Sequence, residues 1–349
     1  MDIGRMFMVG FDGTVVDKKH WIIRAIEEDH LGGVILFDRN VDGSVQNISS
    51  SAQLQELTET LQKYGSGRLL ISVDQEGGKV CRLKDCDGFP ETVSAETLAG
   101  YERQEAIAAA EKMAATLAMH GINFNMAPVV DLDLNPANPI ISRYGRSFAA
   151  DPEKVVRLAR IVIEAHHRAG IGCCLKHFPG HGSAGADSHL GFVDATSAWQ
   201  DEELIPFSRL IEAGKADAVM TAHIINRRLD PQGMPATLSR PVITGLLRRK
   251  LGFSGVVVSD DLQMGAICQK WGFAEAVRLA VLAGVDLLVT GNNLDRREDT
   301  VKVGSQCIQK MLDRGEVDAD YIKASLYRIE VLHKRISGKL PWNSNRPTA

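Results

Sequence analysis

The chain has 349 residues, of which 44% are hydrophobic and 24% are charged, as is typical of a globular enzyme. Its net charge of −4, without a basic run and with only 6% aromatic residues, argues against nucleic-acid binding. No segment approaches the roughly 18 apolar residues of a membrane span. With no signal-peptide pattern and no Cys-x-x-Cys pair among six cysteines, we expect a cytoplasmic protein without disulfides or structural zinc.

Short apolar runs alternate with longer amphipathic segments along the chain. Eight runs are nearly continuous, which is typical of parallel strands covered on both faces. The predicted strands are Met6–Gly10, Gly33–Phe37, Leu69–Val73, Asn123–Pro128, Gly172–Lys176, Ala218–Ala222, Gly255–Ser259 and Val285–Thr290.

Helical patterns fill the intervals, and several carry end signals. Asp151 is a predicted N-cap before Pro152, and Gly170 and Gly284 follow two helices as C-terminal stops. The predicted helices are Lys19–His30, Ser51–Lys63, Glu102–His120, Pro152–Ala169, Glu203–Ala213, Pro241–Leu251, Ala274–Ala283, Thr300–Asp313 and Asp318–Ile336.

Eight βα units in a chain of this length predict an α/β fold, a single-domain (β/α)8 barrel over residues 1–338 with a flexible tail at 339–349. A doubly wound sheet is the alternative, but no Gly-x-Gly-x-x-Gly follows the first strand. Long irregular segments at 75–100, 131–150 and 177–200 all follow strands. They are therefore expected on the C-terminal face of the barrel, where such enzymes carry their active sites.

Charged and imidazole side chains follow the third to seventh predicted strands. Asp74 and Asp260 come directly after apolar runs, so their carboxylates should point into the barrel mouth. Each can act as a nucleophile, a general base or an acceptor for substrate hydroxyls. Lys176, Arg82 and Arg146 supply donors, and this mixture suits a sugar. No His-x-Glu or His-Glu-x-x-His motif is present, so a catalytic zinc is not favoured.

Residues 176–189 hold three histidines, a lysine and an aspartate, with three glycines between them. Lys176 and His177 end an apolar run and should be fixed in place. Asp187 and His189 follow on a glycine-rich loop, a position suited to delivering an acid/base group. Whether His181, and His223 after the sixth strand, touch a substrate is left open by the pattern.

Several segments occur in the order found in glycoside hydrolase family 3, and the chain resembles the family's single-domain bacterial β-N-acetylglucosaminidases. The matching segments are Gly33-Val34-Ile35-Leu36-Phe37, Asp74-Gln75-Glu76-Gly77-Gly78, Asn135-Pro136-Ala137-Asn138-Pro139, Arg146-Ser147-Phe148, Lys176-His177-Phe178-Pro179-Gly180-His181-Gly182, Asp187-Ser188-His189, Thr221-Ala222-His223 and Ser259-Asp260-Asp261-Leu262.

The resemblance implies a barrel that hydrolyses β-glycosides with retention. It implies Asp260 as the nucleophile and His189 as the general acid/base, with Asp187 as its partner. It further implies that five residues bind the terminal N-acetylglucosamine: Asp74, Arg82, Arg146, Lys176 and His177. An exo-β-N-acetylglucosaminidase (β-hexosaminidase, EC 3.2.1.52) acting on 1,6-anhydro-muropeptides in cell-wall recycling is the activity expected from this resemblance.

Three other functions stay open at this point. Phosphate could replace water in a phosphorylase of the same family, the enzyme could be of the β-glucosidase type, or the chain could bind sugar without turnover. We expect no metal and no other cofactor. The expected partner is a small carbohydrate or muropeptide substrate, with no nucleic acid and no membrane, and a monomer is favoured.

Overall fold

The computed structural model describes residues 1–186, 191, 193–293 and 296–342. Within this part of the chain, eight parallel strands form one sheet in the order β10-β1-β2-β3-β4-β5-β7-β9. Their bounds are β1 Phe7–Val9, β2 Gly33–Ile35, β3 Leu70–Val73, β4 Phe124–Asn125, β5 Gly172–Phe178, β7 Ala218–Thr221, β9 Val256–Val258 and β10 Leu288–Thr290.

The sheet closes on itself between its first and last strands. Val258 of β9 forms a parallel bridge with Leu287, next to β10, and the Ser259 N–H donates to the Leu287 carbonyl over 2.9 Å. All eight predicted strands are present, and the (β/α)8 barrel is confirmed.

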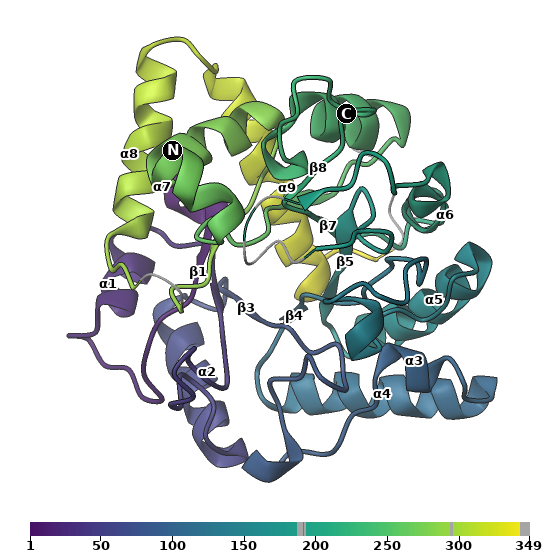
Figure 1. The fold of residues 1–349 in the computed structure, drawn as a ribbon. Helices are drawn as coiled ribbons and strands as arrows, with labels where there is room; N and C mark the ends of the chain where they lie inside the picture. The colour runs from purple at the N-terminus through teal and green to yellow at the C-terminus, as the bar shows by residue number, and fades with distance from the viewer. Residues whose placement is uncertain (187–190, 192, 294–295, 343–349) are drawn as a thin grey trace.

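Helices surround this ring of strands (Figure 1). Their bounds are α1 Trp21–Glu27, α2 Ser51–Tyr64, α3 Ala95–Leu98, α4 Arg103–Met119, α5 Pro152–Arg168, α6 Ile205–Glu212, α7 Gly265–Ala283, α8 Thr300–Asp313 and α9 Ala319–Ile336.

The predicted helix ends have the expected physical causes. The Asp151 carboxylate accepts hydrogen bonds from the backbone N–H groups of Glu153 and Lys154. Asp151 thus caps α5 directly before Pro152, the first residue of the helix. Gly284 ends α7 with a φ of 114°, a left-handed conformation that favours glycine.

Two helices differ from the predicted pattern. The segment Pro241–Lys250 is a π-helix, so its hydrogen bonds span five residues. Helix α7 begins at Gly265, well before the predicted start at Ala274. Gly272 has a φ of 67° and separates two helical stretches within α7, and the predicted helix corresponds to the second stretch. The short helix α3 was not predicted.

The N-terminal end of the barrel is covered by α9, which packs against β5, β9 and the 3-10 helix Ile3–Met6. Figure 1 shows this yellow helix behind the strands. Beyond it, the Trp342 indole stacks on the His167 ring with centroids 3.9 Å apart and donates to the His167 carbonyl over 3.1 Å. Trp342 thus packs on α5, although it lies in the segment predicted as a tail.

The opposite end of the barrel carries the long segments predicted there. After β5, two residues form the strand β6 (Val193–Asp194), which pairs in parallel with β8 (Ile224–Ile225) after β7. This small second sheet was not predicted, because two-residue strands carry too little periodicity to be recognised. It ties the segment after β5 to the one after β7.

Candidate active site

A cavity of about 330 Å³ opens at the C-terminal ends of the strands. Its walls come from segments that follow most of the strands, so residues far apart in sequence share one space. Its lining residues are Ile35, Phe37, Val41, Asp74, Glu76, Val80, Arg82, Ile140, Arg146, Lys176, His177, His181, Met220, Asp260, Asp261, Met264, Val289, Gly291 and Asn293. Six of the predicted site residues are among them: Asp74, Arg82, Arg146, Lys176, His177 and Asp260.

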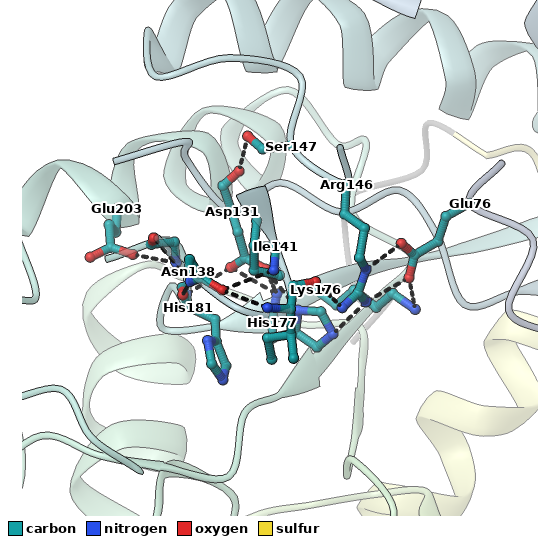
Figure 2. Close-up of polar contacts among 12 residues, drawn as sticks. Glu76, Asp131, Asn138, Ile141, Arg146, Ser147, Lys176, His177, His181 and Glu203 are labelled. Carbon is teal, nitrogen blue, oxygen red and sulfur yellow. Dashed lines mark hydrogen bonds and ion pairs between the residues drawn. The ribbon is translucent and has the colours of Figure 1, made fainter. Parts of the chain in front are cut away.

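Lys176 lies at the centre of the charged groups in this cavity. Its Nζ is 2.8 Å from Asp74 Oδ1 and 2.7 Å from Glu76 Oε1, and its side chain is 2% exposed. Glu76 also accepts two hydrogen bonds from Arg146, with Nε at 2.7 Å and Nη2 at 2.8 Å (Figure 2). Two carboxylates and two cations thus neutralise one another away from bulk water.

The neighbouring cations keep the buried carboxylates of Asp74 and Glu76 ionised. Burial alone would raise the pKa of Glu76, but Arg146 and Lys176 outweigh it and lower that pKa to about 2. For Asp74, burial is likewise outweighed by Lys176 and Arg82, so its pKa lies below the ordinary value. Burial opposes the charge of Lys176, yet Asp74 and Glu76 raise its pKa. All three are therefore charged at neutral pH.

Arg82 forms the next part of the wall. Its Nη2 lies 3.4 Å from Asp74 Oδ2, its Nη1 lies 3.7 Å from Asp38 Oδ1, and its guanidinium carbon is 5.1 Å from the centroid of the Phe37 ring. The guanidinium is thus held between two carboxylates and an aromatic face. It keeps a donor-rich plane at the edge of the cavity, beside Asp74.

Asp131 positions the two histidines of the segment after β5. Its Oδ2 is 2.7 Å from His177 Nδ1, and its Oδ1 accepts the backbone N–H of His181 over 2.8 Å. Arg146 Nη2 lies 3.4 Å from His177 Nε2. Because a guanidinium can only donate, Nε2 faces a donor on one side of the ring, while Nδ1 faces the Asp131 carboxylate on the other.

The start of the loop that leads to residue 187 is fixed by two further buried residues. Glu203 accepts the N–H of Gly182 over 2.9 Å and the Ser183 hydroxyl over 2.6 Å. The Asn138 amide donates to the carbonyls of His181 and Gly182. The far end of the loop is held by the β6–β8 pairing. Both ends of the loop are therefore attached to the barrel.

Asp260 lies two residues after Val258, the last residue of β9, and is partly exposed in the cavity. One of its carboxylate oxygens, Oδ1, accepts the Asp261 N–H over 2.8 Å. The buried His223 supports this turn, since its Nε2 contacts the Asp261 carbonyl at 2.8 Å and its Nδ1 contacts the Thr237 hydroxyl at 2.8 Å. His223 therefore bonds to protein groups on both ring nitrogens.

The predicted acid/base pair, Asp187 and His189, lies outside the described residues. Among the residues that sequence reasoning did not assign to the site, Glu76 and Asp131 are the most important. Glu76 lies two residues after Asp74, within the segment Asp74-Gln75-Glu76-Gly77-Gly78, and this proximity could have indicated its place in the site. Asp131 follows the fourth strand, but its role depends on contacts with residues about fifty positions away.

Neither a metal site nor a membrane helix appears in the part of the chain that the structure describes. No group of three or more histidine, cysteine, aspartate or glutamate side chains there is placed to hold a metal ion. No helix in the same part is both long and apolar enough to cross a bilayer.

The lowered pKa of Glu76 predicts a pH-dependent contribution to stability. Replacing Glu76 by Gln removes a group with a pKa of about 2 in the folded protein and about 4.5 when unfolded. A lowered pKa stabilises the fold above the unfolded value, and this stabilisation is lost as the pH falls towards 2. The difference in free energy of unfolding between wild type and Glu76→Gln should therefore shrink by roughly 3 kcal/mol between pH 6 and pH 2.

Urea denaturation of both proteins at several pH values measures this difference. The titrating groups that do not contact Glu76 are common to both proteins, so their contributions cancel in the comparison. A difference that stays constant over this pH range would contradict the ionised pair with Arg146 and Lys176.

Residues 2–332 match the family described as "Glycosyl hydrolase family 3 N terminal domain". The chain belongs to glycosyl hydrolase family 3. A protein named beta-hexosaminidase, from Tolumonas auensis, is 41% identical over 269 residues, which cover 75% of this chain and 76% of that protein.

Two solved structures are similar to the barrel described above. A β-N-acetylglucosaminidase from Paenibacillus sp. FPU-7 superposes with a TM-score of 0.87 at 34% identity, covering all of this chain and 64% of that one. A β-N-acetylhexosaminidase from Beutenbergia cavernae superposes with a TM-score of 0.84 at 29% identity, covering 95% of this chain and 97% of that one.

Proposed function

We propose that this family 3 chain is a β-N-acetylhexosaminidase that removes terminal β-linked N-acetylglucosamine with retention of configuration. One observation carries the proposal: Asp260 shares a cavity at the C-terminal end of the barrel with the Lys176, Asp74, Glu76 and Arg146 cluster. The relatives named beta-hexosaminidase and β-N-acetylglucosaminidase support the sugar class.

The cavity suits action at the end of a sugar chain. A volume of about 330 Å³ lies near the lower limit of small-molecule pockets, which span roughly 300–1,000 Å³. A single hexosamine fits such a space. The polar wall of Asp74, Arg82 and Arg146 offers acceptors and donors in fixed positions, as recognition of several hydroxyl groups requires.

Asp260 is the proposed nucleophile. Its carboxylate attacks the anomeric carbon and forms a glycosyl ester, while the leaving oxygen takes a proton. The Asp261 N–H donates a hydrogen bond to Asp260 Oδ1 over 2.8 Å, which limits rotation of the carboxylate. Water then attacks the anomeric carbon, and the bond from this carbon to the Asp260 carboxylate breaks.

His189 is the proposed proton donor and acceptor, with Asp187 orienting its ring; both assignments rest on the sequence motif. Imidazole has an ordinary pKa near 6.5, so it can donate a proton in the first step and accept one from water in the second. In glycosidases with two carboxylates, a second acid fills this role.

The proposed sugar-binding residues are held in position by ion pairs and hydrogen bonds with one another. Lys176 is neutralised by Asp74 and Glu76, so it holds these carboxylates in place as acceptors for hydroxyl groups. His177 is oriented by Asp131 and Arg146. By the same analogy the natural substrate is a 1,6-anhydro-muropeptide. A cytoplasmic location is part of the proposal, supported by six cysteines that are all free thiols.

Phosphorolysis and β-glucosidase activity are the competing functions. Product analysis of purified protein with an aryl β-N-acetylglucosaminide, with and without phosphate, separates them. We expect free N-acetylglucosamine at the same rate in both conditions, first released as the β-anomer in NMR spectra. The matching aryl β-glucoside should turn over at least tenfold more slowly. A sugar 1-phosphate, an initial α-anomer, or preference for the glucoside would contradict the proposal.

A further inference from the structure

His181 is buried yet has no hydrogen-bond partner for its ring. The side chain is 2% exposed, and among the described residues neither Nδ1 nor Nε2 finds a partner. In Figure 2 the ring points away from the Asp131–Arg146 cluster, and no dashed line reaches it. Leaving a buried polar group unsatisfied costs about 1–3 kcal/mol, so two such nitrogens require an explanation.

The backbone of His181 cannot relax to relieve this cost. Its N–H donates to Asp131 Oδ1 over 2.8 Å, and its carbonyl accepts from Asn138 Nδ2 over 2.8 Å. Close packing adds to this restraint, since a Cβ on Gly182 would lie 1.8 Å from the Leu132 carbonyl oxygen. The backbone is therefore fixed where the side chain lies at the wall of the cavity that Asp260 also lines.

The ring is neutral at neutral pH. Burial lowers the pKa of His181 to about 4, although the nearby Asp131 acts in the opposite direction. A neutral imidazole has one nitrogen that donates and one that accepts. Hydroxyl groups can do both, so they are the natural complement of such a ring in a polar cavity.

We propose that His181 contacts the bound sugar, its imidazole forming a hydrogen bond with a hydroxyl group of the substrate. This inference rests on the proposed function and adds a specificity-determining residue to it. No protein group among the described residues bonds to the ring, and the ligand supplies the missing partner. The stability that the free protein loses at His181 is recovered when the cavity is filled.

The buried His166 provides a matched control. It is 0% exposed and its pKa is likewise lowered by burial, to about 4. Both of its ring nitrogens, however, have partners: Nδ1 contacts the Val162 carbonyl at 2.8 Å, and Nε2 contacts the Asn125 amide at 3.0 Å. It differs from His181 in having satisfied nitrogens and in lying outside the cavity lining.

The test compares His181→Leu with His181→Asn and His166→Leu. Leucine removes unsatisfied nitrogens at position 181, so the melting temperature of His181→Leu should equal or exceed that of wild type. Its kcat/KM for an aryl β-N-acetylglucosaminide should fall about 10- to 100-fold, as expected for one or two lost hydrogen bonds. Asparagine, nearly isosteric with leucine, should recover part of that loss. His166→Leu should instead lower the melting temperature.

Binding of N-acetylglucosamine and its 3-, 4- and 6-deoxy analogues identifies the hydroxyl. In wild type, one analogue should bind at least fivefold more weakly than the parent sugar, and this penalty should disappear in His181→Leu. The inference is overturned if His181→Leu keeps the wild-type kcat/KM, keeps every deoxy penalty, or loses stability as His166→Leu does. Failure of wild type itself to bind or cleave the parent compounds would instead refute the proposed function.

Discussion

Replacing Asp260 by Ala should reduce kcat/KM for an aryl β-N-acetylglucosaminide by about 10⁴-fold or more, the scale on which loss of an essential group acts in other hydrolases. The variant removes the carboxylate that would carry the sugar between the two steps. Because Asp260 is partly exposed and lies in the lining of the cavity, outside the hydrophobic core, the fold should survive the change.

Azide provides a rescue experiment for this variant. A small anion can occupy the space of the missing carboxylate and attack the anomeric carbon from the same side. We expect added azide to restore turnover in Asp260→Ala and to produce an α-glycosyl azide. Asp261→Ala is the matched control, because it removes the neighbouring carboxylate of the same turn, and it should form no such product.

Covalent trapping identifies the nucleophile directly. A 5-fluoro N-acetylglucosaminyl fluoride should label wild type on the peptide that contains Asp260, as seen by mass spectrometry. A protein that only binds sugar, or one that uses the substrate acetamido group as nucleophile, would form no adduct. Near-wild-type activity of Asp260→Ala, or an adduct on another residue, would contradict the assignment.

Replacing Lys176 by Met should have the second largest effect. The side chain is 2% exposed and bonded to both Asp74 and Glu76. Methionine keeps the volume but leaves two buried carboxylates without their shared cation. Loss of one partner from a buried ion pair costs about 3–5 kcal/mol. We expect a loss of that size in the free energy of unfolding, together with a large loss of activity.

Chemical denaturation measures this effect, and two further variants serve as controls. The pair Lys323–Asp320 is 63% and 88% exposed, so Lys323→Met should cost less than about 1 kcal/mol. In the double variant Lys176→Met/Glu76→Gln, one of the unpaired charges is also removed. Its destabilisation should therefore be smaller than the sum of the two single changes, by roughly 1–3 kcal/mol. Additive effects would contradict direct contact between the two groups.

Much of the barrel could be predicted because its signals are local. Each strand is a continuous apolar run, since a parallel strand is covered on both faces. Asp151 and Pro152 mark the start of α5 through contacts made within one turn. The kink at Gly272 was not recognised, because a glycine within a helical pattern carries no sign of the backbone angle that it adopts.

Part of the site could be predicted, because the position of a residue at the end of a strand indicates at which end of the barrel it lies. Asp74 and Asp260 come just after buried strands and Lys176 lies near the end of one, and the C-terminal ends of barrel strands meet at one face. The sequence by itself therefore determined the barrel, the end of it that carries the cavity, and the presence of these charged residues at that end.

Only the tertiary structure decided which groups pair and which do not. Glu76 binds Arg146, 70 residues away, and Asp74 binds Lys176, 102 residues away. Within the described part of the chain the ring of His181 finds no hydrogen-bond partner, whereas that of His177 is held by Asp131. These outcomes depend on distances of a few ångströms between side chains from different strands. Such distances exist only after the barrel closes, so no pattern along the chain contains them.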